Sequence, residues 1–250
     1  MTSYEAIYNR YSVRKFDKRP LPDALLMNLD KHIEEVDRLN SDISCKIKVV
    51  KDNEEKITGL FRVKAPYYFL VFVDKNKNQA KFEAGYVAEQ LVLFLVARGV
   101  GTCYQGGAKI PKASIPDGME LATIVAFGYS AGRVYREDNQ AKRHPLSKTC
   151  LFKETPDEDF RTLLKAARLA PSALNGQPWR VVVYSNRMYL FCKPKKRMDL
   201  VDCELDAGIF FAHLAVAAEE LWLDVTFSYE ENMLDKFSNR LDYMITIKRL

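Results

Sequence analysis

Residues 170–179 read Ala170-Pro171-Ser172-Ala173-Leu174-Asn175-Gly176-Gln177-Pro178-Trp179, and they decide the architecture of the chain. Two prolines and a glycine within this stretch fix the shape of a loop, from which Ser172 and Asn175 offer hydrogen-bonding groups. The loop follows an expected helix over 157–169 and precedes an expected strand over 180–184. A plain helix-to-strand connection accounts for the prolines, but less readily for the polar side chains.

Strand and helix patterns alternate on both sides of this loop. Runs of β-branched and aromatic residues predict strands over 63–73, 121–128, 179–184, 188–192, 225–229 and 243–248. Apolar residues at helical spacing predict long helices over 79–98 and 204–223. The alternation favours an α+β sandwich over an all-helical bundle.

The two long helices align without gaps. Ala84-Gly85-Tyr86 matches Ala207-Gly208-Ile209, an offset of 123 residues in a chain of 250. A strand, a long helix and a strand that recur at half the chain length predict two similar halves, residues 1–150 and 151–250, packed as one unit. Chance similarity between two amphipathic helices is the alternative.

The composition excludes several classes of protein. The chain is 48% hydrophobic and 28% charged, as an average globular domain is, and its net charge is +5. Its longest apolar run, 91–97, is too short to span a membrane. Its first residues lack the apolar core of a signal peptide. We therefore expect a cytoplasmic protein with no membrane partner.

Metals, disulfides and nucleic acids are not expected either. The five cysteines form no C-x-x-C pair, and the three histidines stand at no metal-ligand spacing. The densest basic cluster, 193–197, is typical of a solvated turn. Nucleic-acid binding would require Arg10, Arg143 and Lys195 to share one face.

Three further segments have chemical character. Asn9-Arg10-Tyr11-Ser12-Val13-Arg14-Lys15-Phe16 places two arginines around a serine, which suits a phosphate dianion, although a solvated basic turn is the plainer interpretation. The glycine-rich segment 99–107 lets a backbone approach a ligand, but it fits neither a dinucleotide fingerprint nor a P-loop. Lys142-Arg143-His144-Pro145-Leu146 is by itself an exposed basic linker.

In this combination the four segments resemble the FMN-dependent nitroreductase family. Residues 170–179 are the most specific match, and the resemblance extends over nearly the whole chain. It implies a mixed or antiparallel sheet fold with long central helices. In ordinary members it also implies a homodimer whose two FMN sites lie at the interface, each built from both subunits.

The order of the segments departs from the family pattern. An ordinary member has the A-P-S loop soon after the arginine-serine opening, where this chain has 34–44 without a Pro-Ser pair. Here the loop stands in the second half, which lacks an Arg-x-Ser-x-Arg segment over 150–160. The losses are complementary, so the resemblance implies a dimer fused into one polypeptide, with one FMN site kept and its mirror lost. Such a pseudo-dimer is expected to be monomeric.

The resemblance also implies which residues hold the cofactor. The phosphate would be bound by the opening segment and the basic linker, through Arg10, Ser12, Lys142 and Arg143, and Tyr11 is a further cofactor-binding residue of the opening segment. Arg14 would lie near N1 and O2 of the flavin, where a cation stabilises the reduced form. The ring and ribityl chain would contact Pro171, Ser172, Ala173 and Asn175. The backbone of Gln105 and Gly106 would face N5, with Gly107 allowing close packing, and Arg62 or Lys64 is a further candidate.

The implied activity is that of an FMN-dependent oxidoreductase. Reducing equivalents would pass from NADH or NADPH through the flavin to an electron-poor small molecule, in a ping-pong reaction that assigns no catalytic side chain and no metal. One alternative is a flavin-binding protein with little turnover, used for storage, sensing or partner binding, in which Tyr104, Phe61 or Phe210 closes the cleft. Another is different flavin chemistry, such as that of an oxidase or a dehalogenase.

Overall fold

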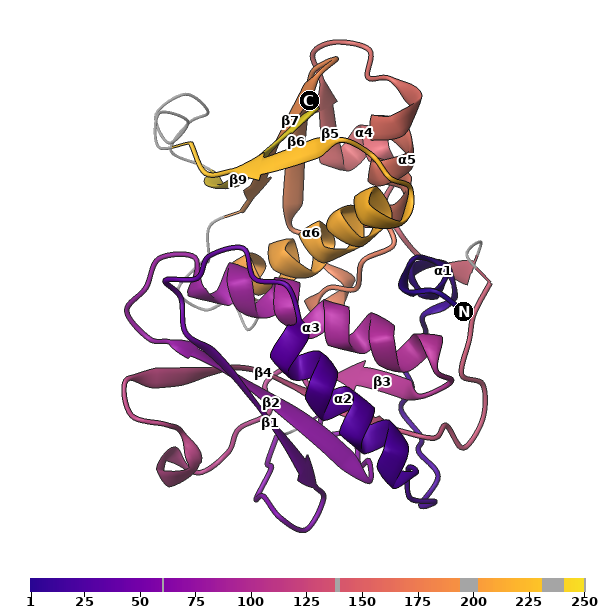
Figure 1. Ribbon diagram of the computed structural model, residues 1–250, viewed down its shortest axis with the longest axis vertical. Helices are drawn as coiled ribbons and strands as arrows, with labels where there is room; N and C mark the ends of the chain where they lie inside the picture. Colours follow the sequence, from indigo (N-terminus) through magenta and orange to yellow (C-terminus); the bar gives the residue numbers. More distant parts are fainter. Residues whose placement is uncertain (60, 138–139, 194–201, 231–240, 250) are drawn as a thin grey trace.

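Two long helices form the centre of the molecule. In the computed structural model, which describes residues 1–59, 61–137, 140–193, 202–230 and 241–249, α3 (Ala80–Ala97) and α6 (Cys203–Glu220) pack against each other. One β-sheet lies on each side of the pair (Figure 1). Both helices are apolar around most of their circumference, as helices buried on all sides must be. The predicted α+β fold with long central helices is confirmed.

The central helices touch at a pair of glycines. A Cβ atom added to Gly85 would lie 2.1 Å from the carbonyl oxygen of Leu205, and one added to Gly208 would lie 2.0 Å from that of Phe82. Phe82 and Leu205 are 123 residues apart in sequence, as Gly85 and Gly208 are. The crossing is therefore reciprocal, as in an isologous contact between two copies of one helix.

The first sheet is antiparallel throughout, in the order β1-β2-β4-β3. Its strands are β1 (Cys45–Lys51), β2 (Tyr67–Asp74), β3 (Gly101–Tyr104) and β4 (Met119–Gly128). Strand β2 is buried along nearly its whole length because α3 packs on one face of the sheet and residues from 57–65 and 108–115 cover the other.

The second sheet repeats this order and adds one strand. Its strands are β5 (Cys150–Phe152), β6 (Trp179–Val183), β7 (Arg187–Cys192), β8 (Val225–Ser228) and β9 (Asp242–Arg249). They are arranged β5-β6-β7-β9-β8, with β5 parallel to β6 and the other pairs antiparallel. The expected boundary between residues 150 and 151 falls inside β5.

Shorter helices complete the fold. They are α1 (Ser3–Asn9), α2 (Asp23–Glu35), α4 (Leu146–Thr149) and α5 (Glu158–Ala167), with 3-10 turns at Lys112–Ser114 and Ala173–Asn175. Thr2 and Glu5 form a capping box at the start of α1, and the side chain of Asp157 caps α5. Among the described helices, none has both the length and the hydrophobicity needed to cross a membrane.

Three differences from the sequence expectations have a clear physical reason. The strand expected over 63–73 begins at Tyr67, directly after a proline, which has no N–H to donate. Strand β1 was not expected, because lysines alternate with its half-buried apolar residues. The glycine-rich segment contains strand β3, in which Gly101 is required because a Cβ there would lie 2.6 Å from Val13 Cγ2. Of the basic cluster 193–197, only residue 193 lies within the described residues.

Helices α3 and α6 end in the same Schellman geometry with different residues. The N–H of Val100 donates to the Leu95 carbonyl (3.0 Å), and the N–H of Leu223 donates to the Ala218 carbonyl (2.9 Å). The residue immediately before Val100 is Gly99, which has a left-handed backbone conformation (φ +79°). The residue immediately before Leu223 is Trp222, which has the same left-handed conformation (φ +54°) and a side chain that is 91% exposed.

Trp222→Gly is expected to raise the free energy of unfolding by about 1 kcal/mol. The substitution relieves left-handed strain and removes almost no packing, although the greater freedom of glycine in the unfolded chain offsets part of the gain. Chemical denaturation of the variant and the wild type measures the difference. Trp222→Ala keeps the Cβ and should stay within about 0.5 kcal/mol of the wild type; an equal gain in both variants would contradict the explanation.

Candidate functional site

The arginine-serine segment leaves α1 as an extended chain that is held on both sides. Arg10 forms an isolated bridge with Tyr135, and Ser12 forms one with Thr102 of β3. Arg10 is buried, with 2% of its surface exposed, whereas Arg14 is exposed. The two arginines of this segment therefore lie in different environments, and Arg10 is not part of a basic surface.

Arg10 belongs to a buried cluster between α3, α6 and β3. Its Nε lies 3.7 Å from Glu89 Oε1. Glu89 Oε1 also lies 2.8 Å from His213 Nε2, and Glu89 Oε2 accepts a hydrogen bond from the Tyr104 hydroxyl (2.7 Å). Burial lowers the pKa of His213 and raises that of Tyr104, which is therefore a neutral donor. The contact between Glu89 on α3 and His213 on α6 therefore links the two central helices next to Arg10.

The basic linker and the 170–179 loop are bound to each other. Asn175 Nδ2 donates to the Lys142 carbonyl (2.9 Å), and Arg143 Nη1 donates to Asn175 Oδ1 (2.9 Å). Arg143 Nη2 also donates to the carbonyl of Leu169 (3.1 Å). The structure thus brings two of the segments singled out in the sequence into direct contact, and Asn175 orients Arg143.

Arg10 and Arg143 form an electropositive region with unused donors. Burial, followed by the nearby charges of Arg10 and Arg136, lowers the pKa of Arg143 to about 10. Nε and Nη1 of Arg10 and Nε of Arg143 are buried and have no hydrogen-bond acceptor among the described residues. Neighbouring arginines whose charges repel each other, and which keep buried N–H groups without acceptors, indicate a site for an anion.

The 170–179 loop has a strained backbone that its own side chains hold in place. Leu174, Asn175 and Gln177 all have positive φ (+51°, +56° and +47°), which is costly for residues other than glycine. Ser172 Oγ accepts from the Gln177 N–H (3.0 Å), and Gln177 Oε1 accepts from the His144 N–H (2.8 Å). Strain of this kind is typical of functional loops.

A buried carboxylate on α6 also holds this loop. Asp206 accepts from the Ala173 N–H at 3.0 and 3.1 Å. The residue 123 positions earlier, Glu83 on α3, accepts from the Leu39 N–H at 3.2 Å. Burial raises the pKa of both carboxyl groups, that of Asp206 to about 7. Glu83 therefore holds the segment around Leu39 against α3 in the same way that Asp206 holds the 170–179 loop against α6.

Asp206→Asn is expected to stabilise the protein above pH 7 and to remove part of its pH dependence. The folded chain keeps the Asp206 proton up to a pKa of about 7, whereas the ordinary value is 3.8. The wild type therefore loses stability as the pH rises through this window, by up to roughly 4 kcal/mol. Asparagine retains an acceptor for the Ala173 N–H without the charge.

Denaturant midpoints at acidic and mildly alkaline pH measure this effect. The stability gained by Asp206→Asn should be small near pH 4 and should grow until the pH exceeds the folded pKa of about 7. Glu220→Gln, an exposed change on the same helix, is the control and should follow the wild-type curve. A gain that stays constant with pH would contradict the assignment.

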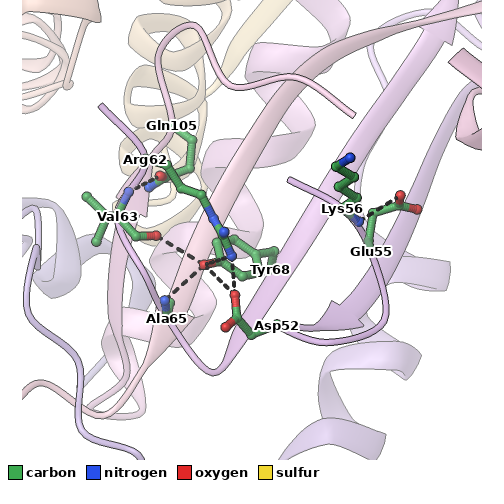
Figure 2. Close-up of polar contacts among 8 residues, drawn as sticks. All are labelled: Asp52, Glu55, Lys56, Arg62, Val63, Ala65, Tyr68 and Gln105. Carbon is green, nitrogen blue, oxygen red and sulfur yellow. Dashed lines mark hydrogen bonds and ion pairs between the residues drawn. The ribbon is translucent and has the colours of Figure 1, made fainter. Parts of the chain in front are cut away.

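The glycine turn after β3 is open on its outer side. Gly106 and Gly107 are exposed, a Cβ on either would meet nothing within 4 Å, and Gly107 has φ +74°. The N–H groups of both make no hydrogen bond with the described part of the chain. Gln105 is buried: its Oε1 accepts from the Val63 N–H (2.7 Å; Figure 2) and its Nε2 donates to the Cys103 carbonyl (2.9 Å).

A hydrogen-bond network around Tyr68 supports the segment that holds Gln105. Figure 2 shows the partners of its hydroxyl group, which are Asp52, Arg62, Val63 and Ala65. Arg62 also forms an ion pair with Asp52. Of the two further candidates for a flavin contact, Arg62 is therefore engaged in this network and Lys64 is exposed.

The remaining predicted residues lie around these parts. Pro171 is buried, whereas Ser172 and Ala173 are half-buried and Lys142 is exposed. The Tyr11 ring lies 4.6 Å from the guanidinium carbon of Arg133. Two of the bulky candidates lie in opposite environments. Phe210 packs in the core against Trp179 and Phe61 is 72% exposed.

The sequence interpretation missed Glu89, His213 and Asp206. Their contacts join residues far apart in the chain, so no local spacing indicates them. The available signal was a charged residue in the middle of a helix that is otherwise apolar on all sides. Two cavities, of about 230 and 580 Å³, lie away from this region, the larger beside α5.

Comparison with known proteins gives a consistent result. A family model described as "Putative TM nitroreductase" matches residues 2–218. The crystal structure of a putative nitroreductase from Thermotoga maritima is similar with a TM-score of 0.69 and 22% identity, covering 100% of this chain and 94% of that one. At that identity the match shows the fold alone.

Two further relatives match over shorter lengths. A nitroreductase with bound FMN from Desulfitobacterium hafniense covers 58% of this chain and 100% of its own, with 16% identity and a TM-score of 0.44. A putative NAD(P)H nitroreductase from Staphylococcus saprophyticus is 42% identical over 45 residues, which are 18% of this chain and 20% of that protein. The match thus spans about a fifth of that curated relative.

Proposed function

Because this chain belongs to the TM nitroreductase family, we propose that it is an FMN-dependent oxidoreductase with one flavin site per chain. The observation with the greatest weight is the pair formed by the buried Arg10 and the half-buried Arg143, whose unused donors an FMN phosphate would satisfy. Ser12 and Lys142 lie on the same two segments and would add further donors. Asn175 would act on the phosphate through Arg143, which it orients.

The donors elsewhere in the site fit the flavin ring. The polar edge of a flavin ring needs hydrogen-bond donors and room to approach them. Gly106 and Gly107 offer both, because their N–H groups are free and the space beside them is open. Arg14 is exposed and would stabilise negative charge on the reduced ring. Pro171, Ser172 and Ala173 would contact the cofactor from the second half of the chain.

The chain's own residues would bind, orient and expose the cofactor. When bound, FMN supplies the two-electron chemistry by which NADH or NADPH would reduce an electron-poor small molecule in a ping-pong reaction. Gly106, Gly107 and the 84% exposed Leu174 leave this region open. That openness favours turnover over storage of a buried flavin.

We also infer that residues 1–150 and 151–250 form a fused pseudo-dimer. Support comes from the reciprocal contacts of Gly85 and Gly208, from the repeated strand order and from the matching roles of Glu83 and Asp206. The second half has no counterpart of Arg10 before α5 in the described residues, since β5 leads into that helix. A single flavin site per chain follows.

Anaerobic titration of the FMN-loaded protein tests the proposed activity. Addition of NADH or NADPH should bleach the flavin absorbance, and a quinone or nitroaromatic compound should then restore it in a separate step. Initial rates with both substrates should give the parallel double-reciprocal lines of a ping-pong reaction. Bound FMN that neither nicotinamide reduces would indicate the flavin-binding protein instead.

A further inference from the structure

A second region on the central helices has the opposite charge. A cavity of about 230 Å³ is formed by α3, α6 and β8 together with the residues after α2. Asp37 and Glu219 line it and are exposed, whereas Tyr86 lines it and is buried. The carboxylates therefore lie toward solvent and the phenol lies deeper.

The cavity lies over positions of α6 whose counterparts on α3 are buried in the core. Helix α1 packs mainly on α3 and also contacts α6, and Val92 and Val96 of α3 are buried. The residues 123 positions after Val92 and Val96 are Ala215 and Glu219, and both line the cavity. In the described residues of the second half, the chain passes from β5 to α5 without a helix equivalent to α1.

Tyr86 lines this cavity and makes its hydroxyl group accessible from it. Its side chain is 6% exposed, and the hydroxyl forms no hydrogen bond with any residue that the structure describes. Burial, followed by the charges of Asp37, Glu83 and Glu219, raises its pKa, so the group remains a neutral phenol. Because Tyr86 lines the cavity and solvent can reach its hydroxyl there, a ligand in the cavity can bind this group.

The other polar groups of the cavity are hydrogen-bond acceptors. Gln90 Nε2 donates to the Asp37 and Tyr86 carbonyls, both at 3.2 Å, which leaves its amide oxygen free. The carboxylates of Asp37 and Glu219 form no ion pair within the described ranges. Val225 and Phe227 of β8 supply an apolar wall. Acceptors and negative charge on one side and an apolar wall on the other suit a cation with a hydrocarbon body.

We propose that this cavity binds a small organic cation, a primary alkylammonium of a few carbon atoms. The ammonium group would be held by Asp37 and Glu219, and the alkyl chain would pack on Val225 and Phe227. The volume corresponds to roughly eight water molecules, which admits a small molecule and is too little for a helix. The site is separate from the flavin region and does not depend on the proposed function.

Calorimetric titration of the 250-residue chain with butylammonium chloride, with and without added FMN and at matched ionic strength, tests the proposal. Saturable binding of one cation per chain is expected. Butan-1-ol has the same alkyl chain without the charge and should bind at least about tenfold more weakly, and butanoate should not bind. Methyl NMR signals of Val225 should shift during the titration while those of Val50, in the other sheet, stay in place.

Variants identify the groups responsible. The double substitution Asp37→Asn with Glu219→Gln should weaken butylammonium binding at least about tenfold, and Tyr86→Phe should weaken it about fivefold. Glu220→Gln removes the neighbouring exposed carboxylate, which does not line the cavity, and should leave the affinity unchanged. Absence of saturable binding, equal affinity for butan-1-ol, or unchanged affinity in the double variant would overturn the proposal.

Discussion

Gly85→Ala and Gly208→Ala should each lower the free energy of unfolding by at least about 3 kcal/mol. The added methyl group would lie 2.1 or 2.0 Å from a backbone carbonyl oxygen of the other helix, a contact that no side-chain rotation relieves. The helices would have to separate, which opens gaps throughout the core that they share. Because the two contacts are reciprocal, the two variants should be destabilised by similar amounts.

Urea denaturation of the two variants measures this effect. Gly132→Ala is the matched control, since a Cβ at Gly132 would meet nothing within 4 Å and its φ is not in the left-handed region. It should stay within about 0.5 kcal/mol of the wild type. A loss below about 1 kcal/mol in either helix variant would show that the helices do not cross at these glycines.

Arg143→Ala and Arg10→Ala should each weaken FMN binding at least about 30-fold. Hydrogen bonds to charged groups contribute about 1.5–3 kcal/mol, and each guanidinium has at least one buried N–H group that no described protein group accepts from. Asn175→Ala should weaken binding about tenfold, because it releases Arg143 from its 2.9 Å hydrogen bond. Fluorescence titration with FMN gives the dissociation constants.

Two controls separate this effect from general loss of charge. Arg19→Ala removes an exposed arginine that pairs with Asp17, and it should bind FMN as the wild type does. Arg143→Lys keeps the charge but not the planar fork, so its affinity should lie between those of Arg143→Ala and the wild type. Wild-type affinity in Arg10→Ala or in Asn175→Ala would exclude a site shared between the two halves.

The central helices and most strands could be predicted from sequence because their patterns are local. Long apolar runs specify α3 and α6, and β-branched and aromatic runs specify β2, β6 and β7. Strand β3 could not be predicted in this way, because a glycine such as Gly101 is typical of a turn. Gly101 is required there by contact with Val13, a residue far away in the sequence.

The candidate site was predictable to the extent that its residues form sequence motifs. Arg10, Arg143 and Asn175 were identified from three separate segments, and the structure places Arg143 against Asn175 and within electrostatic reach of Arg10. Glu89 and His213 belong to no motif. Their contact at 2.8 Å arises only when α3 and α6 pack together, which residue spacing along the chain does not encode.

The number of FMN molecules bound per chain tests the central claim most directly. Equilibrium titration of the purified protein with FMN, followed by flavin fluorescence, should saturate at one FMN per chain, because one complete set of donors is assembled from both halves. Saturation at two per chain would show that the second half retains a site of its own. Failure to bind FMN would contradict the assignment of Arg10 and Arg143 as its phosphate ligands.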